Sequence, residues 1–357
     1  MKRIIVLLVA SLLALPALPQ GVAFRPLGLD EALQQAGKEQ KLLFVDCFTT
    51  WCSPCIYMTN NVFSRKEAGD FFNKHFVSIM IDMEQEEGAK LNRRYATVAS
   101  FPTYLILAPG GEEQYRLIGR HELPRFLELV SRGLDKRNAL PVLEKEYAAG
   151  NMTNERVRDY LFALDDARRD AGGVFRSFAA RLTTGEKTSP FFWPLLSNPG
   201  VNPYSTENAR FVFEHAGEIQ AGVGEKAVRA YLLDAYNALL TTYLINKIPA
   251  ENPAEMTALV REQLAARPLP ASDTLRGKLE IAAALANQRF EEAVEQLGKH
   301  IACFSLADFG MIMGICNRLD RQNKELMKKV AAIPLDNIPD PAFKEAMKNY
   351  IKYFASI

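Results

Sequence analysis

The sequence predicts an α/β unit in its first part and an all-helical region in the remainder. Between residues 42 and 118, short apolar runs rich in β-branched and aromatic residues alternate with stretches of helical spacing. Beyond residue 137, helical spacing continues with few strand signals. With 357 residues, 48% of them hydrophobic, the chain is long enough for two domains that each bury a core.

The amino terminus has the pattern of a cleaved signal peptide. A short basic region at residues 1–3 precedes an apolar stretch at 4–15, and Gly21-Val22-Ala23 places small residues at the two positions that a signal peptidase reads. We therefore assign residues 1–23 as a signal peptide and expect an exported protein, periplasmic or secreted. No later run approaches the ~20 apolar residues that a membrane span needs, so no transmembrane segment is expected in the mature chain.

The elements of the α/β unit follow from hydrophobic spacing and turn signals. Residues 42–48 form a compact apolar block that is typical of a buried strand. Pro109-Gly110-Gly111 predict a turn between the last two strands. The expected order is helix 29–38, strand 42–48, helices 56–63 and 64–73, strand 76–81, helix 86–95, strands 103–107 and 114–118, and helix 122–134. This order suits a central mixed sheet with helices on both faces.

Cys52 and Cys55 lie two residues apart at the junction between the strand 42–48 and the helix that follows. Unpaired N–H groups and the positive end of the dipole favour an anion at the start of a helix. We therefore expect the pKa of Cys52 to fall from about 8.5 to roughly 3.5–7.5, which makes Cys52 the candidate nucleophile. Cys55, one turn further in and more covered, is the candidate resolving thiol. Pro54 suits the first helical turn because it has no N–H.

Other uses of this cysteine spacing fit the sequence less well. Structural zinc needs four ligands, and no second close pair of Cys or His follows at a usable interval. Covalent haem attachment would need a His where Ile56 stands. A purely structural bridge of this size would close a very small loop and stabilise the fold little. These residues favour redox chemistry, with no metal and no cofactor beyond the Cys52–Cys55 disulfide.

The stretch from Val45 to Cys55, together with Ser100-Phe101-Pro102-Thr103-Tyr104, resembles the thioredoxin superfamily. More narrowly, it is similar to secreted bacterial thioredoxin-like domains related to the periplasmic module of the transmembrane disulfide reductase. The resemblance covers about residues 24–136 and implies a thioredoxin-like fold with thiol-disulfide exchange on protein disulfides.

The resemblance also assigns roles to residues around the two cysteines. Asp46 matches a buried carboxylate beneath the disulfide that would exchange a proton with Cys55 through water, whereas the alternative is a solvent-exposed Asp. Pro102 matches the family's cis-proline, which presents an edge to the substrate backbone. Phe101 is bulkier than the usual residue before that proline, which bears on substrate preference. Trp51 and Pro54 are assigned to substrate binding with Phe101 and Pro102.

Residues 137–357 are predicted to form an all-helical domain after the thioredoxin-like domain of residues 24–136. The piece at 279–293 resembles a helical hairpin of the tetratricopeptide type, although no second copy follows at a fixed period. Cys303 and Cys316 either form a bridge or stay free thiols, and Cys47 is expected to pack as an inert small hydrophobe. The expected helices cover residues 139–149, 154–167, 173–182, 206–219, 225–246, 253–266, 273–286, 290–300, 306–319 and 323–332.

The charge balance gives no reason to expect nucleic acid or an anionic membrane surface as a partner, since 43 basic residues face 42 acidic ones. The expected partners are proteins with disulfides and a membrane or periplasmic thiol that donates electrons. The sequence therefore predicts an exported thiol-disulfide oxidoreductase, acting as a reductase or isomerase. The alternative is a non-enzymatic interaction protein whose helical domain binds a partner, with the cysteine-bearing domain as a scaffold or redox switch.

Overall fold

A computed structural model describes residues 21–245, 252–266, 272–320 and 322–355. The predicted signal peptide falls almost wholly on residues 1–20, so that prediction lies outside the described residues. Contacts divide the chain into two compact units, one that ends at Val174 and one that begins at Phe175. In the part of the chain that is described, none of the helices is both long and apolar enough to cross a membrane.

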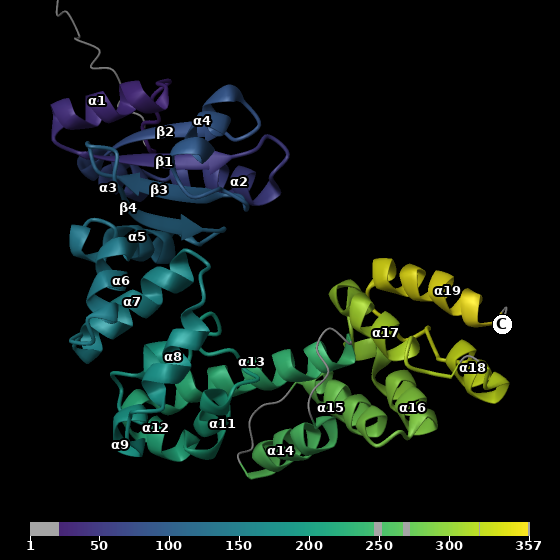
Figure 1. The fold of residues 1–357 in the computed structure, drawn as a ribbon. Coiled ribbons are helices and arrows are strands. Elements are labelled where there is room, and N and C mark those ends of the chain that lie inside the picture. Colours follow the sequence, from purple (N-terminus) through teal and green to yellow (C-terminus); the bar gives the residue numbers. More distant parts are fainter. Residues whose placement is uncertain (1–20, 246–251, 267–271, 321, 356–357) are drawn as a thin grey trace, which may run out of the picture. The chain divides into compact units, whose positions relative to one another are not determined.

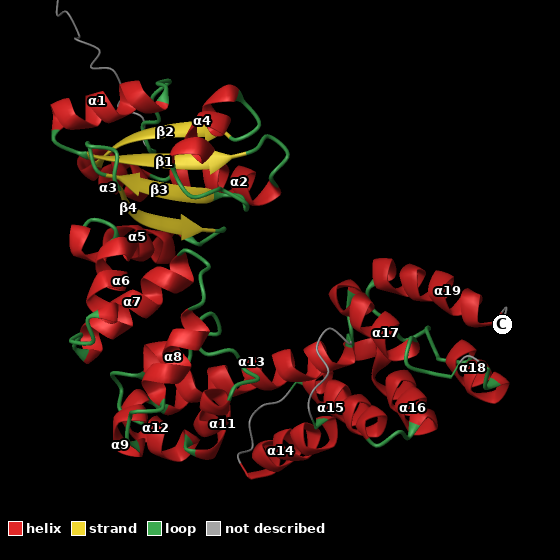
Figure 2. Ribbon diagram, viewed as in Figure 1, coloured by secondary structure: helices red, strands yellow, loops and turns green. Residues whose placement is uncertain are grey.

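Four strands form the sheet found among the described residues, drawn in yellow in Figure 2. They are β1 (Leu42–Phe48), β2 (Phe76–Asp82), β3 (Thr103–Leu107) and β4 (Glu113–Ile118). The order across the sheet is β2-β1-β3-β4, with β1 parallel to β2 and antiparallel to β3, and with β3 antiparallel to β4. The mixed sheet that the sequence predicts is thus confirmed.

Helices cover both faces of this sheet (Figure 1). Helix α2 (Ser53–Met58) runs directly into a π-helical segment, Thr59–Phe63, so the helix predicted after the cysteines is present, with a wider second half. The helices of this layer are α1 (Leu29–Glu39), α2 (Ser53–Met58), α3 (Lys66–His75), α4 (Glu86–Arg94) and α5 (Leu123–Arg132). Each lies within a few residues of its predicted position.

The side chains of β1 alternate between the two faces of the sheet. Leu43, Val45 and Cys47 are buried in one cluster with residues of α1 and α4. Cys47 is therefore a buried small hydrophobe, as predicted. Phe44 and Asp46 point to the opposite face, where α3 and α5 pack.

An aromatic cluster fills the face that carries Phe44. Phe44 packs edge to face on Phe72 of α3 with ring centroids 4.7 Å apart, and it stacks on Tyr104 of β3 at 5.6 Å. The ring centroid of Phe126, on α5, lies 4.8 Å from that of Tyr104 and 5.8 Å from that of Phe72. Such pairs stabilise a core beyond their area of burial. The cluster fixes α3 and α5 against the strand that leads to the two cysteines.

Helices α6 (Leu140–Ala148) and α7 (Asn154–Asp166) also belong to the first unit. Asp166, the last residue of α7, is buried and accepts hydrogen bonds from the Tyr115 hydroxyl at 2.6 Å and from Nη1 of Arg132 at 3.0 Å. These bonds fix α7 against β4, an edge strand. The contacts therefore place α6 and α7 with the sheet and divide the chain after Val174. The two domains expected over residues 24–136 and 137–357 remain a prediction from the sequence.

The second unit contains helices and no strand among its described residues (Figure 2). Helix α8 (Ala171–Ala179) spans the division between the units. The helices that follow are α9 (Thr184–Lys187), α10 (Trp193–Leu196), α11 (Glu207–Glu214), α12 (Ala216–Val223), α13 (Glu225–Leu244), α14 (Pro253–Ala266), α15 (Asp273–Ala286), α16 (Phe290–His300), α17 (Phe309–Cys316), α18 (Lys324–Ala331) and α19 (Pro341–Ala355). This confirms the all-helical prediction. Helices α15 and α16 pack against each other as a hairpin, but a tetratricopeptide-type repeat stays a prediction.

Three parts of this unit differ from the predicted helices. The single helix expected over residues 206–219 is two helices, because the backbone leaves the helical region at His215. The helix expected over residues 306–319 begins as a 3-10 turn. Helices α9, α10 and α19 were not predicted. Proline usually indicates a loop, but Pro341 is the first residue of α19. The N–H groups of the first helical turn have no acceptor within the helix, so a proline there costs no helix hydrogen bond.

The two cysteines of the second unit are not joined to each other. Cys303 is partly exposed, Cys316 is buried in α17, and neither forms a disulfide. Of the two outcomes that the sequence leaves open, the structure has the one without a bridge.

Candidate functional site

Cys52 and Cys55 form a disulfide at the beginning of α2, with their Cα atoms 5.3 Å apart. Cys52 immediately precedes the first helical turn, and its Sγ accepts a hydrogen bond from the Cys55 N–H at 3.2 Å. Pro54 stands in that first turn, where a proline leaves no donor unused. The Cys52 sulfur thus receives a backbone donor and lies at the positive end of the helix dipole. Both effects favour a thiolate once the disulfide is reduced.

The burial of the two cysteines differs from the expectation. Cys55 was expected to be more covered, but Cys52 is 3% exposed and Cys55 is 4% exposed. The Cys52 side chain turns toward the first turn of α2, where it accepts the Cys55 N–H, instead of pointing outward. The assignment of Cys52 as the nucleophile therefore depends on its place at the helix start and not on exposure.

Asp46 lies near the end of β1 and is only 2% exposed. Burial raises its pKa from the usual 3.8 to about 7. In the described residues, no group forms a hydrogen bond with its Oδ1 atom. Asp46 is therefore buried, and the alternative of a solvent-exposed Asp46 is wrong. A carboxyl with this pKa can take up and release a proton near neutral pH.

Tyr104, which the sequence analysis did not single out, faces Asp46 across the sheet. The two residues are directly opposite each other in the antiparallel pair of β1 and β3, so their side chains share one face. Tyr104 is buried, and no described residue bonds to its hydroxyl. Burial and the charge of Asp46 raise the pKa of Tyr104 well above its usual value, which keeps the phenol neutral. A tyrosine within an otherwise aliphatic strand was the signal that could have identified it.

The Phe101–Pro102 peptide bond is cis, as the family resemblance implied. Pro102 directly precedes β3, and its carbonyl oxygen accepts a hydrogen bond from the Gly119 N–H at 2.9 Å. Gly119 has a φ of +105°, a conformation that favours glycine, so the loop after β4 can approach the proline closely. No sequence pattern indicated this role for Gly119.

Apolar side chains are exposed next to the disulfide. Trp51 is 67% exposed and Ile56 is 50% exposed. The Trp51 ring packs edge to face on Phe101, with centroids 6.1 Å apart, and its Nε1–H donates to Oε1 of Glu84 at 2.9 Å. Glu84, which lies after β2, had not been predicted to take part. Trp51, Phe101 and Ile56 together provide an apolar surface suited to a polypeptide substrate.

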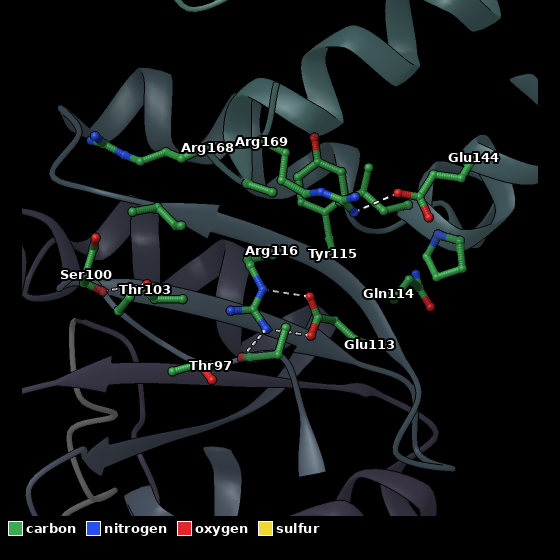
Figure 3. Close-up of a pocket in the computed structure, with 16 residues that line it drawn as sticks. Thr97, Ser100, Thr103, Glu113, Gln114, Tyr115, Arg116, Glu144, Arg168 and Arg169 are labelled. Atoms are coloured by element: carbon green, nitrogen blue, oxygen red, sulfur yellow. Dashed lines mark hydrogen bonds and ion pairs between the residues drawn. The ribbon is translucent and has the colours of Figure 1, made fainter. Parts of the chain in front are cut away.

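A pocket of 510 Å³ lies in the first unit, lined by residues on both sides of the Phe101–Pro102 bond, by β4, by α6 and by the residues that follow α7 (Figure 3). One wall contains Ser100 and Thr103, which flank the Phe101–Pro102 bond, and Ile118 from the end of β4. Arg168 and Arg169, from the residues that follow α7, also line the pocket. The pocket thus brings residues outside the predicted site next to the proline loop.

Metal-ligating side chains do not gather in the described part of the chain. Within it, no group of three or more His, Cys, Asp and Glu side chains could hold a metal ion.

Comparison with known protein families matches residues 25–109 to the family described as thioredoxin-like. That stretch contains Asp46, both motif cysteines and Pro102. A comparison with curated proteins finds no match.

Three solved structures resemble part of the chain. A candidate disulphide isomerase from Bacteroides thetaiotaomicron is 45% identical over 33% of this chain and 98% of its own, with a TM-score of 0.31. The oxidised C-terminal domain of DsbD from Neisseria meningitidis is 21% identical over 29% of this chain and 90% of its own, with a TM-score of 0.26. A DsbH oxidoreductase is 19% identical over 34% of this chain and 92% of its own, with a TM-score of 0.27. Each similarity is confined to about a third of the chain.

Proposed function

Because this chain belongs to the thioredoxin-like family through residues 25–109, we propose that it is an exported thiol-disulfide oxidoreductase that acts on protein disulfides. The observation that supports this most is the position of the Cys52 sulfur at the start of α2, where it accepts a hydrogen bond from the Cys55 N–H. The buried Asp46 lies on β1, the strand that precedes the two cysteines. The disulfide itself is the redox group of the proposed reaction.

The reaction begins with the reduced dithiol form of the protein. The Cys52 thiolate attacks one sulfur of a substrate disulfide, which forms a mixed disulfide and releases the first substrate thiolate. Cys55 then attacks Cys52 Sγ, which closes the Cys52–Cys55 disulfide and releases the second substrate thiolate. Two electrons have passed to the substrate, whose two thiolates take up protons. A dithiol donor in the membrane or periplasm would return two electrons to the protein.

Asp46 is the proposed proton acceptor for the second step. Cys55 attacks as a thiolate, so it must first lose a proton in a buried setting. A carboxyl with a pKa of about 7 is partly ionised at neutral pH and can accept that proton.

Trp51, Pro54, Phe101 and Pro102 are the proposed docking residues. The exposed Trp51 ring and its neighbour Phe101 offer apolar contact beside the disulfide. Pro102 presents the adjacent backbone, to which an extended substrate segment could pair. The proposed direction is reduction or isomerisation, and export is supported by the signal-like pattern of residues 1–23.

Insulin reduction tests the proposed function. With dithiothreitol as the electron source, the protein is expected to accelerate the precipitation of the insulin B chain well above the uncatalysed rate. No acceleration would contradict the proposal and favour the interaction protein, in which the helical region binds a partner and the cysteine pair does not turn over.

A further inference from the structure

We propose that the pocket beside the Phe101–Pro102 loop is a subsite that binds an acidic side chain of the substrate polypeptide, with Arg168 as the group that recognises the carboxylate. This inference rests on the proposed function, because it concerns the substrate of the same redox site. It adds a charge preference to the apolar surface described above.

Arg168, which follows α7, lies beside the loop that contains Phe101 and Pro102. Gly119 donates its N–H to the Pro102 carbonyl, so Gly119 lies against the proline loop. A Cβ atom on Gly119 would lie 3.1 Å from Nη2 of Arg168, which places the guanidinium directly beside that loop. Burial lowers the pKa of His121, two residues further on, and the charge of Arg168 adds to this effect. A substrate segment that docks at Pro102 would therefore pass close to this cation.

The other charged residues of the pocket are already paired. Arg116 forms an ion pair with Glu113 at 2.8 Å, and Arg169 forms one with Glu144 at 2.7 Å. Arg168 is exposed and forms no ion pair with any carboxylate in the described part of the chain. Figure 3 shows Arg169 turned toward Glu144, whereas the Arg168 side chain extends in the other direction, away from Glu144. One positive charge thus remains for a ligand, and a guanidinium matches the geometry of a carboxylate.

The backbone at Arg168 determines which substitution removes its side chain with the least disturbance. Its φ of +51° lies in the left-handed region, which favours glycine. The Arg168 N–H donates to the Asp165 carbonyl at 2.8 Å and the Arg169 N–H donates to the Leu164 carbonyl at 2.7 Å. This pattern closes the carboxyl end of a helix and usually has glycine at the position of Arg168. An arginine here is unfavourable for the backbone, so glycine can replace it without straining this helix end.

The chain offers a matched control for this helix end. Gln288 follows α15 with a φ of +57°, its N–H donates to the Leu285 carbonyl at 3.1 Å, and the next N–H donates to the Ala284 carbonyl at 2.9 Å. Gln288 and Arg168 therefore share one backbone motif. Replacing either residue with glycine removes the same unfavourable positive φ of a non-glycine residue. Only Arg168→Gly also removes the guanidinium that is proposed to bind the substrate carboxylate.

Peptides that contain one internal disulfide and differ only in the residues flanking their cysteines test the subsite. One peptide has Glu at these positions, a second has Gln and a third has Lys. The reduced protein is mixed with each peptide, and the fluorescence of Trp51 follows the formation of the Cys52–Cys55 disulfide. We expect the Glu peptide to react about two- to five-fold faster than the Lys peptide, with Gln between them, and we expect salt to reduce the difference.

Arg168→Gly is expected to abolish this preference while its Tm stays within about 2 °C of the wild type. Arg168→Lys should keep part of the preference, and Gln288→Gly should keep all of it. Equal rates for the Glu and Lys peptides with the wild type, or an unchanged preference in Arg168→Gly, would overturn the subsite while leaving the redox function intact. If the wild type reduced none of the peptides, the proposed function itself would fail, and the subsite with it.

Discussion

Replacing Cys52 with serine is expected to lower insulin reduction to the uncatalysed background, because no other cysteine of the described residues lies at a helix start with a backbone N–H directed at its sulfur. Replacing Cys55 with serine should have a different effect. Cys52 would still attack the substrate, but the mixed disulfide would persist because the thiol that displaces it is gone.

Non-reducing electrophoresis and intact mass spectrometry distinguish these two outcomes. Cys55→Ser should accumulate a covalent adduct with insulin that dithiothreitol releases, whereas Cys52→Ser should form none. Cys303→Ser is the control, since Cys303 belongs to the second unit and should be replaceable without loss of turnover. An adduct in Cys52→Ser, or normal turnover by Cys55→Ser, would show that the roles of the two cysteines are assigned incorrectly.

Replacing Asp46 with asparagine is expected to stabilise the oxidised protein at alkaline pH and to slow the resolving step. A carboxyl whose pKa rises from 3.8 to about 7 on folding destabilises the folded state by about 4 kcal/mol once it is ionised in both states. The folded state binds the extra proton between these two pKa values, so the free energy of unfolding of the wild type should fall as the pH rises from 4 to above 7. The asparagine side chain of the variant has no proton to lose in this range, so this pH dependence should disappear.

Urea unfolding at several pH values measures this effect. Trp51 reports on the first unit, and a Trp193→Phe background removes the signal of the second tryptophan. Asp70→Asn is the control, because Asp70 is exposed on α3 and its replacement should leave the pH dependence unchanged. The same Asp46→Asn variant should release trapped substrate about ten- to a hundred-fold more slowly at neutral pH. A variant with the pH profile and the release rate of the wild type would rule out Asp46 as the proton acceptor.

Much of the first unit could be predicted because its signals are local. The apolar run that forms β1 is short and bounded, and the turn at Pro109-Gly110-Gly111 joins β3 and β4 as expected. Gly111 has a φ of +92°, and its N–H bonds to the Ala108 carbonyl at 2.8 Å, which is the role that a turn glycine is expected to have. The cis bond at Pro102 was predicted from the family resemblance, since local spacing contains no sign of it.

The remaining features depend on contacts between distant parts of the sequence. Arg168 meets Gly119 because Asp166 is bonded to Tyr115 and Arg132, and no periodic pattern in the sequence encodes that pairing. The bond from Trp51 to Glu84 likewise joins two loops. Sequence spacing therefore predicted which residues carry the proposed chemistry but not the residues that surround them.

The pKa of the Cys52 thiol in the reduced protein tests the account most directly. The rate of alkylation by iodoacetamide, measured against pH in the Cys55→Ser variant and corrected with the Cys52→Ser variant, gives this value. We predict a midpoint within roughly 3.5–7.5, because the start of α2 and the backbone N–H of residue 55 stabilise the thiolate. A midpoint at or above about 8.5, the value of an ordinary thiol, would contradict the assignment of Cys52 as an activated nucleophile.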